Sequence, residues 1–226
     1  MKAAQINSYG GPEVIEVTQA HLIDHASHKT KPDMPAGKLW IEVNSASINP
    51  IDWKIRAGYL KERVPLKFPV TLGTDFSGVV MEAGEDVPDF KQGDEVYGNA
   101  SVLNGGTGTF AGFVIVDAIR VSHKPKNVNH IEAGALPLAG VSAIQALEDH
   151  INLKSGQKIL IHGGAGGIGH IAIQIAKSLG AHVATTVSEK DKDFVKGLGA
   201  DVVIDYKNEN FEDMIKDYDA VFDTAG

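Results

Sequence analysis

The most regular hydrophobic pattern of the chain lies between residues 159 and 179. A short apolar run, Ile159 to Ile161, is followed at once by a glycine-rich segment and then by apolar residues with helical spacing. The apolar helical positions are Ile168, Ile171, Ala172, Ile175, Ala176 and Leu179. Intervals of three and four residues are typical of a helix with one buried face. The pattern therefore predicts a strand, a tight turn and a helix, in that order.

The pattern continues as alternating strands and helices up to residue 226. We expect strands over 181–187, 202–204 and 220–222, and helices over 190–198 and 208–217. Near-continuous apolar strands that alternate with helices are typical of a parallel sheet covered on both faces. The second half of the chain is therefore expected to be an α/β domain with a doubly wound parallel sheet.

The first half of the chain has a different pattern, in which apolar and polar residues alternate with the period of a strand. Strands are expected over 39–43, 76–83, 94–97 and 110–116. Glycine and proline lie between them, as is usual for turns. From residue 131 to residue 150 the period becomes helical. We therefore predict a β-rich domain over residues 1–124 and an α/β domain over residues 125–226.

The glycines after Ile161 fit the pattern G-x-G-x-x-G. Between a strand and a helix, this pattern predicts a dinucleotide site. Gly164 permits the tight turn, Gly166 lets the backbone approach a pyrophosphate, and Gly169 lets the helix pack closely against the strand. The free N–H groups at the start of the helix then face the phosphates. The expected cofactor contacts in the turn are Gly164, Ala165, Gly166, Gly167, Ile168 and Gly169.

Composition and charge then limit the classes of function. The formal net charge is 21 − 29 = −8, which argues against a nucleic-acid partner. The absence of cysteine excludes disulfides, cysteine zinc ligands and a cysteine nucleophile. No apolar run is long enough to span a membrane and the N-terminus has no signal-peptide pattern, so we expect a cytoplasmic protein without a membrane partner.

Several further segments have sequences that are shared with a known family. They are Met1–Ala3, Tyr9–Pro12, Ser47–Asp52, Leu72–Val80, Gly93–Gly98 and Pro137–Gly140. Together with the glycine turn they resemble the zinc-free, quinone-oxidoreductase-like branch of the medium-chain dehydrogenase/reductase superfamily, over the whole chain. The resemblance implies a GroES-like catalytic domain followed by a Rossmann domain that binds NADPH, with the active site in the cleft between them.

Zinc-dependent members of that superfamily carry a cysteine ligand near the position of Asn49, and Gly-His-Glu where this chain has Gly73-Thr74-Asp75. A catalytic zinc ion needs three protein ligands, and Asp75 alone does not provide them. The other candidate metal pattern consists of His21, His25 and His28. These histidines lie in a polar segment without a carboxylate-rich frame. We therefore expect no metal.

The resemblance implies hydride transfer from a reduced nicotinamide to a quinone or to the β-carbon of an α,β-unsaturated carbonyl. Asn49 matches the family's active-site asparagine, which implies that it positions the substrate or the nicotinamide ribose. Lys54 resembles a substrate-facing residue that would donate to the developing oxyanion. Tyr59 is a further catalytic candidate, one position out of register with the family's aromatic residue. From the residues alone, Asn49 can equally be a turn residue before Pro50, and Lys54 a solvated surface lysine. Asp52 is interpreted as a helix cap.

The nicotinamide cofactor is predicted to be NADPH. An NAD site carries an acidic residue about 20 residues after the glycine turn, where it binds the ribose 2′-OH, whereas this chain has Thr186 at the end of the second strand. The expected contacts beyond the turn are Thr186, Ser188, Lys192 and Tyr206. Lys192, or its neighbour Lys190, would meet the 2′-phosphate, although Glu189 and Asp191 favour the opposite preference.

Complete members of the family continue beyond a fourth Rossmann strand, so we expect a truncated version of a longer protein. Val221 and Phe222 would then lie on an exposed apolar sheet edge, which favours association, and a homodimer is an open alternative. The predicted function is NADPH-dependent, zinc-independent reduction of a quinone or enone. The alternative is a non-catalytic NADPH-binding protein or an inactive fragment of such an enzyme.

Overall fold

A computed structural model of the protein describes residues 1–20 and 34–225. His21, His25 and His28, which have the spacing of metal ligands, lie outside the described residues. None of the helices in the described part of the chain is long and apolar enough to cross a membrane.

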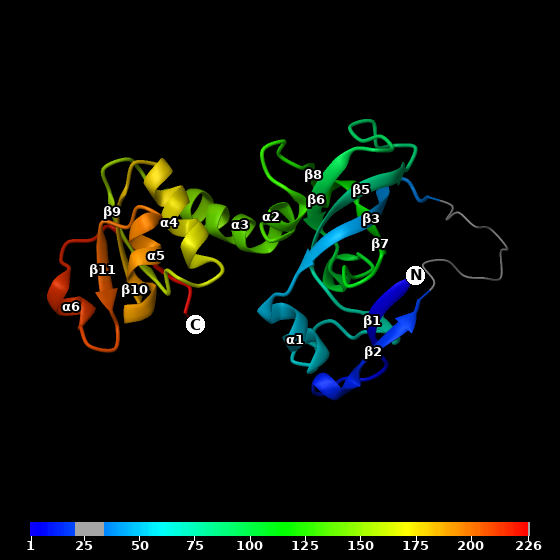
Figure 1. Ribbon diagram of the computed structural model, residues 1–226, viewed down its shortest axis with the longest axis horizontal. Coiled ribbons are helices and arrows are strands. Elements are labelled where there is room, and N and C mark those ends of the chain that lie inside the picture. Colours follow the sequence, from blue (N-terminus) through cyan, green and yellow to red (C-terminus); the bar gives the residue numbers. More distant parts are fainter. Residues whose placement is uncertain (21–33, 226) are drawn as a thin grey trace. The chain divides into compact units, whose positions relative to one another are not determined.

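Contacts within the chain divide it into two compact units, Met1–Leu138 and Ala139–Gly226. Each unit is described by itself, and Figure 1 shows the strands and helices of both. The first unit is rich in strands, and the second alternates strands with helices. The predicted order of a β-rich part and an α/β part is therefore confirmed. The domain boundary between residues 124 and 125 stays a prediction.

The described residues of the first unit form two antiparallel sheets. The smaller, in the order β2-β1-β4, consists of β1 (Lys2–Ile6), β2 (Ile15–Gln19) and β4 (Val70–Thr71). The larger, in the order β7-β3-β5-β6-β8, consists of β3 (Lys38–Ser47), β5 (Asp75–Ala83), β6 (Glu95–Asn99), β7 (Phe113–Asp117) and β8 (Val121–His123). The four predicted strands are present, but the last begins at Phe113 because residues 110–112 bond to β1 instead. There the Ala4 N–H donates to the Phe110 carbonyl at 2.8 Å.

The helices of the first unit are short. They are α1 (Pro50–Arg56), α2 (His130–Gly134) and the 3₁₀ turns η1 (Pro12–Val14), η3 (Val102–Asn104) and η4 (Ala118–Arg120). α1 begins with a proline, which suits the first position of a helix. The Asp52 carboxylate accepts a hydrogen bond from the Asn49 N–H at 2.7 Å, so the predicted capping role of Asp52 is confirmed.

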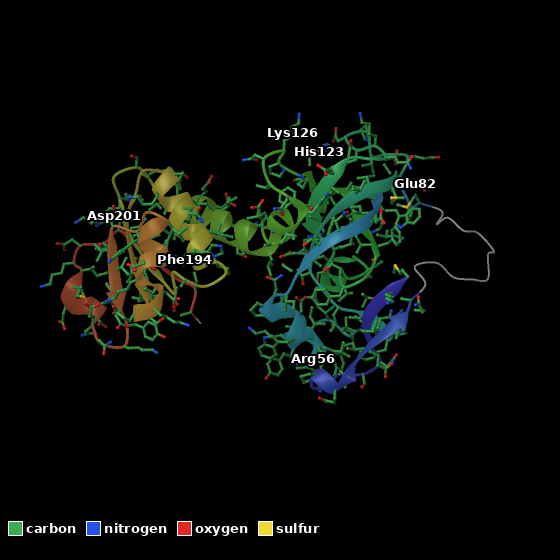
Figure 2. The ribbon with its side chains drawn as sticks, in the orientation of Figure 1. Arg56, Glu82, His123, Lys126, Phe194 and Asp201 are labelled. Atoms are coloured by element: carbon green, nitrogen blue, oxygen red, sulfur yellow. The ribbon has the colours of Figure 1, made fainter. Side chains whose placement is uncertain are left out.

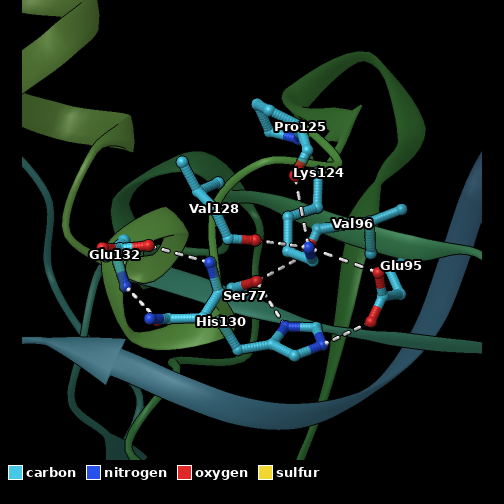
Figure 3. Close-up of polar contacts among 9 residues, drawn as sticks. Ser77, Glu95, Val96, Lys124, Pro125, Val128, His130 and Glu132 are labelled. Atoms are coloured by element: carbon cyan, nitrogen blue, oxygen red, sulfur yellow. Dashed lines mark hydrogen bonds and ion pairs between the residues drawn. The ribbon is translucent and has the colours of Figure 1, made fainter.

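The helical stretch predicted over 131–150 is divided into α2, α3 (Pro137–Ile144) and a π-helical segment, η5 (Gln145–His150). Pro137 separates the first two because it lacks an N–H and disfavours helical geometry in the residue before it. At the start of α2, His130 contacts the larger sheet (Figure 3). Its Nδ1 lies 2.7 Å from the Ser77 Oγ, and its Nε2 lies 3.2 Å from the Glu95 Oε1. This contact fixes α2 to β5 and β6.

The second unit contains a parallel sheet in the order β11-β10-β9-β12. Its strands are β9 (Lys158–His162), β10 (His182–Val187), β11 (Val202–Asp205) and β12 (Ala220–Asp223). Its helices are α4 (Gly169–Ser178), the 3₁₀ turn η6 (Glu189–Asp191), α5 (Lys192–Gly197) and α6 (Phe211–Met214). The predicted strand–turn–helix at β9 and α4 is confirmed. Its apolar face packs on the buried core, for example through Ile173 against Ile159 and Ile161.

Two predictions for the end of the chain need correction. The helix expected over 208–217 is reduced to α6, because the Asp205 carboxylate holds the Lys207 N–H in a turn at 3.1 Å and Asp217 has a left-handed φ of +58°. On the edge strand β12, Val221 is 58% exposed, as expected. Phe222 is not exposed, since it packs against the core of the unit.

A polar contact fixes α4 to the sheet at the opposite ends of the strands from the glycine turn. The Asp201 carboxylate, labelled in Figure 2, accepts from Lys177 Nζ at 2.7 Å and from the Val183 N–H at 2.7 Å. Burial alone would raise the pKa of Asp201, but these hydrogen bonds outweigh it and lower the pKa. The contact joins the last turn of α4 to the start of β10 and β11.

Candidate functional site

The glycine turn follows β9 and leads directly into α4. Gly163 has a φ of +71°, a left-handed conformation that favours glycine. A Cβ at Gly164 would lie 2.0 Å from the Thr185 Oγ1, and a Cβ at Gly169 would lie 2.2 Å from the Gly163 carbonyl oxygen. Side chains are therefore excluded at both positions, as the roles of these glycines in a dinucleotide turn require.

The turn leaves open backbone at the start of α4. Gly166 and Gly167 are exposed, and a Cβ at Gly167 would have no atom within 4 Å. Because the first N–H groups of a helix have no partner within the helix, this end of α4 fits a phosphate group. Ala165 and Ile168 direct their side chains to the apolar core of the unit, so only their backbone belongs to the turn.

A pocket of about 610 Å³ lies beside the turn within the second unit. It is lined by His162, Gly163, Thr186, Tyr206, Glu209, Asn210, Phe211, Glu212, Asp223 and Ala225. The Thr186 Oγ1 accepts from the Gly163 N–H at 3.2 Å and shares a hydrogen bond with His162 Nδ1 at 3.0 Å. The His162 ring also packs edge-on against Phe211, with 4.8 Å between the centroids. The pocket therefore brings Thr186 and Tyr206 together, along with aromatic and acidic side chains that sequence reasoning missed.

The other two predicted cofactor contacts are already paired with carboxylates. Lys192 Nζ lies 2.8 Å from the Glu189 carboxylate and 3.7 Å from that of Glu209, and the hydrogen bond to Glu189 raises the pKa of Lys192. The Ser188 Oγ donates to the Asp191 carboxylate at 2.5 Å. A phosphate at Lys192 would therefore replace an existing carboxylate partner.

Asn49, the first catalytic candidate, belongs to a polar cluster in the first unit. Its Nδ2 donates to the Asp75 carboxylate at 2.9 Å and to the Ser47 Oγ at 3.2 Å. Asp75 also accepts from the Ser47 hydroxyl at 3.1 Å and from the Leu138 N–H at 3.1 Å. The cluster joins the end of β3, the start of α1 and the start of β5, so it fixes the position of the Asn49 side chain.

Two carboxyl groups of this cluster are buried. Asp75 is 0% exposed and Asp52 is 3% exposed. Asp52 accepts from the Thr74 hydroxyl at 2.7 Å in addition to the Asn49 N–H. Burial raises the pKa of both groups, although their hydrogen bonds act in the opposite direction. In the described part of the chain, no group of three or more His, Asp or Glu side chains is arranged to hold a metal ion.

Of the other two catalytic candidates, Lys54 lies on the exposed side of α1, and Tyr59 lies in the turn that follows it. Tyr59 is 69% exposed and Lys54 is also exposed. Their side chains meet at Trp53, whose ring lies 5.8 Å from Lys54 Nζ and makes an edge-on contact with Tyr59 at 5.3 Å. Sequence reasoning missed Trp53, although its spacing of four residues from Asn49 places both on one face of a helix.

One further group of reactive side-chain types, the Ser77–His130–Glu95 contact, resembles a nucleophile–base–acid arrangement. Ser77 is fully buried and its hydroxyl also bonds to the Val96 carbonyl at 3.0 Å. Lys124 closes the contact by approaching the Glu95 carboxylate at 3.3 Å. A nucleophile must reach its substrate, so this contact has a structural role.

Two family models match the chain. The alcohol dehydrogenase GroES-like domain matches residues 35–126, and the zinc-binding dehydrogenase model matches residues 167–226. The first unit is thus GroES-like, and the parallel sheet of the second unit is the Rossmann-like part of the same architecture.

Similar proteins include the mitochondrial NAD(P)H oxidoreductase RTN4IP1 of Bos taurus, at 39% identity over 100% of this chain and 60% of the relative. The chloroplastic NADPH-dependent alkenal/one oxidoreductase of Arabidopsis thaliana is 37% identical over 100% of this chain and 58% of the relative. Among solved structures, the quinone oxidoreductase of Coxiella burnetii matches with a TM-score of 0.84 and 36% identity, over 100% of this chain and 69% of that one. The chain thus spans about 60% of the length of the curated relatives.

Proposed function

Because this chain belongs to the quinone-oxidoreductase-like branch of the medium-chain dehydrogenase/reductase superfamily, we propose that it serves NADPH-dependent, zinc-independent reduction of a quinone or an α,β-unsaturated carbonyl. The observation that carries the proposal is the glycine turn at the start of α4, which excludes side chains at Gly164 and Gly169. Similarity to named quinone and alkenal/one oxidoreductases supports the substrate class.

The residues of the second unit would bind the dinucleotide. The open backbone at Gly166 and Gly167 would take the pyrophosphate, and Tyr206 would flank the adenine end. Lys192 would exchange Glu189 for the 2′-phosphate, which is a stronger partner because it carries more charge. When bound, the reduced nicotinamide supplies the hydride.

The residues of the first unit would position the substrate and stabilise its charge. Asn49 is held rigidly by its buried cluster and is suited to orientation. Lys54 has an exposed ammonium group beside Trp53 and is suited to donate to the oxygen on which negative charge builds. Tyr59, in contact with the same ring, is the alternative donor.

Zinc independence is supported by the bonding of Asp75. Its two carboxylate oxygens already accept hydrogen bonds from Ser47, Asn49 and Leu138. These bonds take up most of the acceptor capacity of the carboxylate, and a catalytic zinc ion needs three protein ligands. The cytoplasmic location stays a prediction, since the names of relatives include mitochondrial and chloroplastic proteins.

Titration with NADPH and NADH, followed by hydride transfer to 1,2-naphthoquinone and to an open-chain enone, tests the proposal. We expect tighter binding of NADPH and its oxidation by at least one acceptor, with no change after treatment with a chelator. Equal or tighter NADH binding would refute the cofactor preference. NADPH binding without oxidation would favour a non-catalytic binding protein, and loss of activity on chelation would refute zinc independence.

A further inference from the structure

The ammonium group of Lys192 contacts two carboxylates that come from different segments of the second unit. Glu189, in η6, lies 2.8 Å from Lys192 Nζ, and Glu209, which follows β11, lies 3.7 Å from it. The closer contact is a hydrogen bond, and it raises the pKa of Lys192. The ammonium group that we assign to the 2′-phosphate is therefore already paired with a carboxylate in the free protein.

The Glu209 carboxylate is fixed by the backbone. It accepts a hydrogen bond from the Asp205 N–H at 2.7 Å, and the Glu209 N–H donates to the Asp205 carbonyl at 2.8 Å. If the Glu209 side chain moved away from Lys192, the Asp205 N–H at the end of β11 would lose its acceptor, which is unfavourable. We therefore expect Glu209 to stay in place when a ligand binds.

The Glu189 carboxylate is held less firmly. Its side chain is 73% exposed, and among the described residues Lys192 is the only partner of its carboxylate. An exposed ion pair of this kind contributes little to stability, because both groups are well solvated when they separate. Glu189 can therefore turn into the solvent without breaking any other bond of its side chain.

A phosphate that approaches Lys192 affects the two carboxylates differently. An ammonium group has three N–H donors, so Lys192 can keep its contact with Glu209 and transfer the donor that faces Glu189 to a phosphate oxygen. The phosphate and the Glu189 carboxylate carry charges of the same sign and repel each other at contact distance. Phosphate binding thus requires that Glu189 move away and that its ion pair with Lys192 be broken.

We propose that Glu189 is a specificity-determining residue, whose carboxylate occupies the place of the 2′-phosphate in the free protein and so lowers the preference for NADPH over NADH. The proposal rests on the proposed function, in which Lys192 meets the 2′-phosphate. NADH has a hydroxyl group there and leaves the Lys192–Glu189 pair intact, so Glu189 weakens the binding of NADPH alone. Asp191, the other acidic residue nearby, bonds to Ser188 instead.

Titration of the parent protein and of Glu189→Gln with NADPH and with NADH tests the proposal. This substitution keeps the size of the side chain and removes its charge. We expect the Kd for NADPH to fall roughly fivefold, which corresponds to the loss of one exposed ion pair, while the Kd for NADH changes less than twofold. An unchanged or higher Kd for NADPH, or an equal fall for NADH, would overturn the proposal.

Asp193→Asn is the matched control for the loss of one negative charge. Asp193 is an exposed residue of α5, directly after Lys192 in the chain. We expect both Kd values of this variant to stay within about twofold of the parent values, because exposed charges that are not in contact are screened by salt. A fall in the Kd for NADPH as large as that in Glu189→Gln would show a general effect of charge and would overturn the proposal.

A measurement without any ligand tests the ion pair itself. NMR titration follows the side-chain signal of Lys192, assigned by its loss in Lys192→Ala. Because the hydrogen bond to Glu189 raises the pKa of Lys192, this pKa should be lower in Glu189→Gln than in the parent protein. An identical pKa in the two proteins would mean that the pair does not form in solution, and would overturn the proposal.

A double-variant cycle shows whether Glu189 acts through Lys192. In the Lys192→Ala background, Glu189→Gln should change the Kd for NADPH less than twofold, because the carboxylate is no longer held at the phosphate position. A fall in the Kd that is equally large with and without Lys192 would overturn the proposal.

Adenosine 2′,5′-bisphosphate, which carries the 2′-phosphate but no nicotinamide, separates this proposal from the proposed function. We expect its Kd to fall roughly fivefold in Glu189→Gln, and that of 5′-AMP, which lacks the 2′-phosphate, to change less than twofold. If the parent protein binds NADPH without oxidising it, the proposed reduction fails, but these Kd values still decide the role of Glu189. If NADPH is oxidised and the bisphosphate binds equally to both proteins, the reduction stands and the proposal for Glu189 is overturned.

Discussion

Substitution of Gly164 by alanine tests whether the glycine turn is as tightly packed as the structure indicates. The added Cβ would lie 2.0 Å from the Thr185 Oγ1 and 3.0 Å from the Ile173 Cδ1. The end of the isoleucine side chain can move, but Thr185 is fully buried. Its hydroxyl donates to the Ile161 carbonyl at 2.7 Å, so a displaced Thr185 also loses a hydrogen bond.

The expected loss of stability follows from these two effects. Overpacking of a core costs about 1–3 kcal/mol, and a lost internal hydrogen bond costs about 1 kcal/mol. The sum is about 2–4 kcal/mol. For a domain of the size of the second unit, Ala139–Gly226, each kcal/mol lowers Tm by about 4–8 °C. We therefore expect Gly164→Ala to lower the Tm of this unit by at least about 8 °C.

Thermal unfolding followed by far-UV circular dichroism measures this shift. Gly167→Ala is the matched control, because its Cβ would meet nothing within 4 Å, and its Tm should stay within about 2 °C of the parent value. Thr185→Ala removes the atom that the new Cβ would strike. The double variant Gly164→Ala/Thr185→Ala should therefore be less destabilised than the sum of the two single variants.

The reasoning would be refuted if the effects of Gly164→Ala and Thr185→Ala on stability were additive in the double variant. It would also be refuted by a Tm for Gly164→Ala close to that of Gly167→Ala. Both tryptophans, Trp40 and Trp53, lie in the first unit, so their emission follows that unit during the same scan. Comparison of the two signals shows whether the loss of stability begins in the second unit, where the substitution is made.

Three other predictions concern charged groups. Lys192→Ala should raise the Kd for NADPH roughly tenfold and that for NADH much less, with Lys196→Ala, a change at an exposed lysine of α5, as the control; equal effects on both cofactors would contradict this. Lys54→Met should lower single-turnover hydride transfer about 10²–10³-fold at unchanged NADPH affinity, and an unaltered rate would make Lys54 a surface residue. Because burial raises the pKa of Asp52 and Asp75, their stabilising contribution is complete below pH 3.8, the ordinary value, and is lost as pH rises through the raised values. Asp52→Asn should therefore flatten the pH dependence of urea unfolding above pH 3.8, and a slope equal to that of the parent would contradict it.

The parts of the fold that the sequence predicts are those in which local pattern and packing agree. The run Ile159–Ile161 is apolar because β9 is buried on both faces, and Gly169 is required by its contact with Gly163 within the same turn. The cap of α1 is similarly local, since Asp52 lies three residues from Asn49. Interactions between residues that are close in the chain leave a recognisable pattern in the sequence, and this pattern was sufficient to predict the strand, the glycine turn and the helix cap.

The parts that the sequence does not predict depend on residues far apart in the chain. Lys192 approaches Glu209, and His162 packs against Phe211, because strand ends of a parallel sheet meet at one edge. The shortened α6 depends on a side chain outside it, the Asp205 carboxylate, which holds the preceding turn. Hydrophobic periodicity carries no information on such pairs, so the lining of the pocket could not be predicted.

The segment from Asn49 to Lys54 provides two different kinds of side chain, one suited to orient a bound molecule and one suited to donate to a substrate oxygen. Asn49 is anchored by a buried cluster, and a rigid side chain is suited to orient a bound molecule but cannot follow a moving charge. Lys54, five residues along, is exposed beside Trp53, and a flexible donor can adjust to substrate oxygens in different positions. Loss of Asn49 should therefore raise KM and lower kcat, and loss of Lys54 should lower kcat alone.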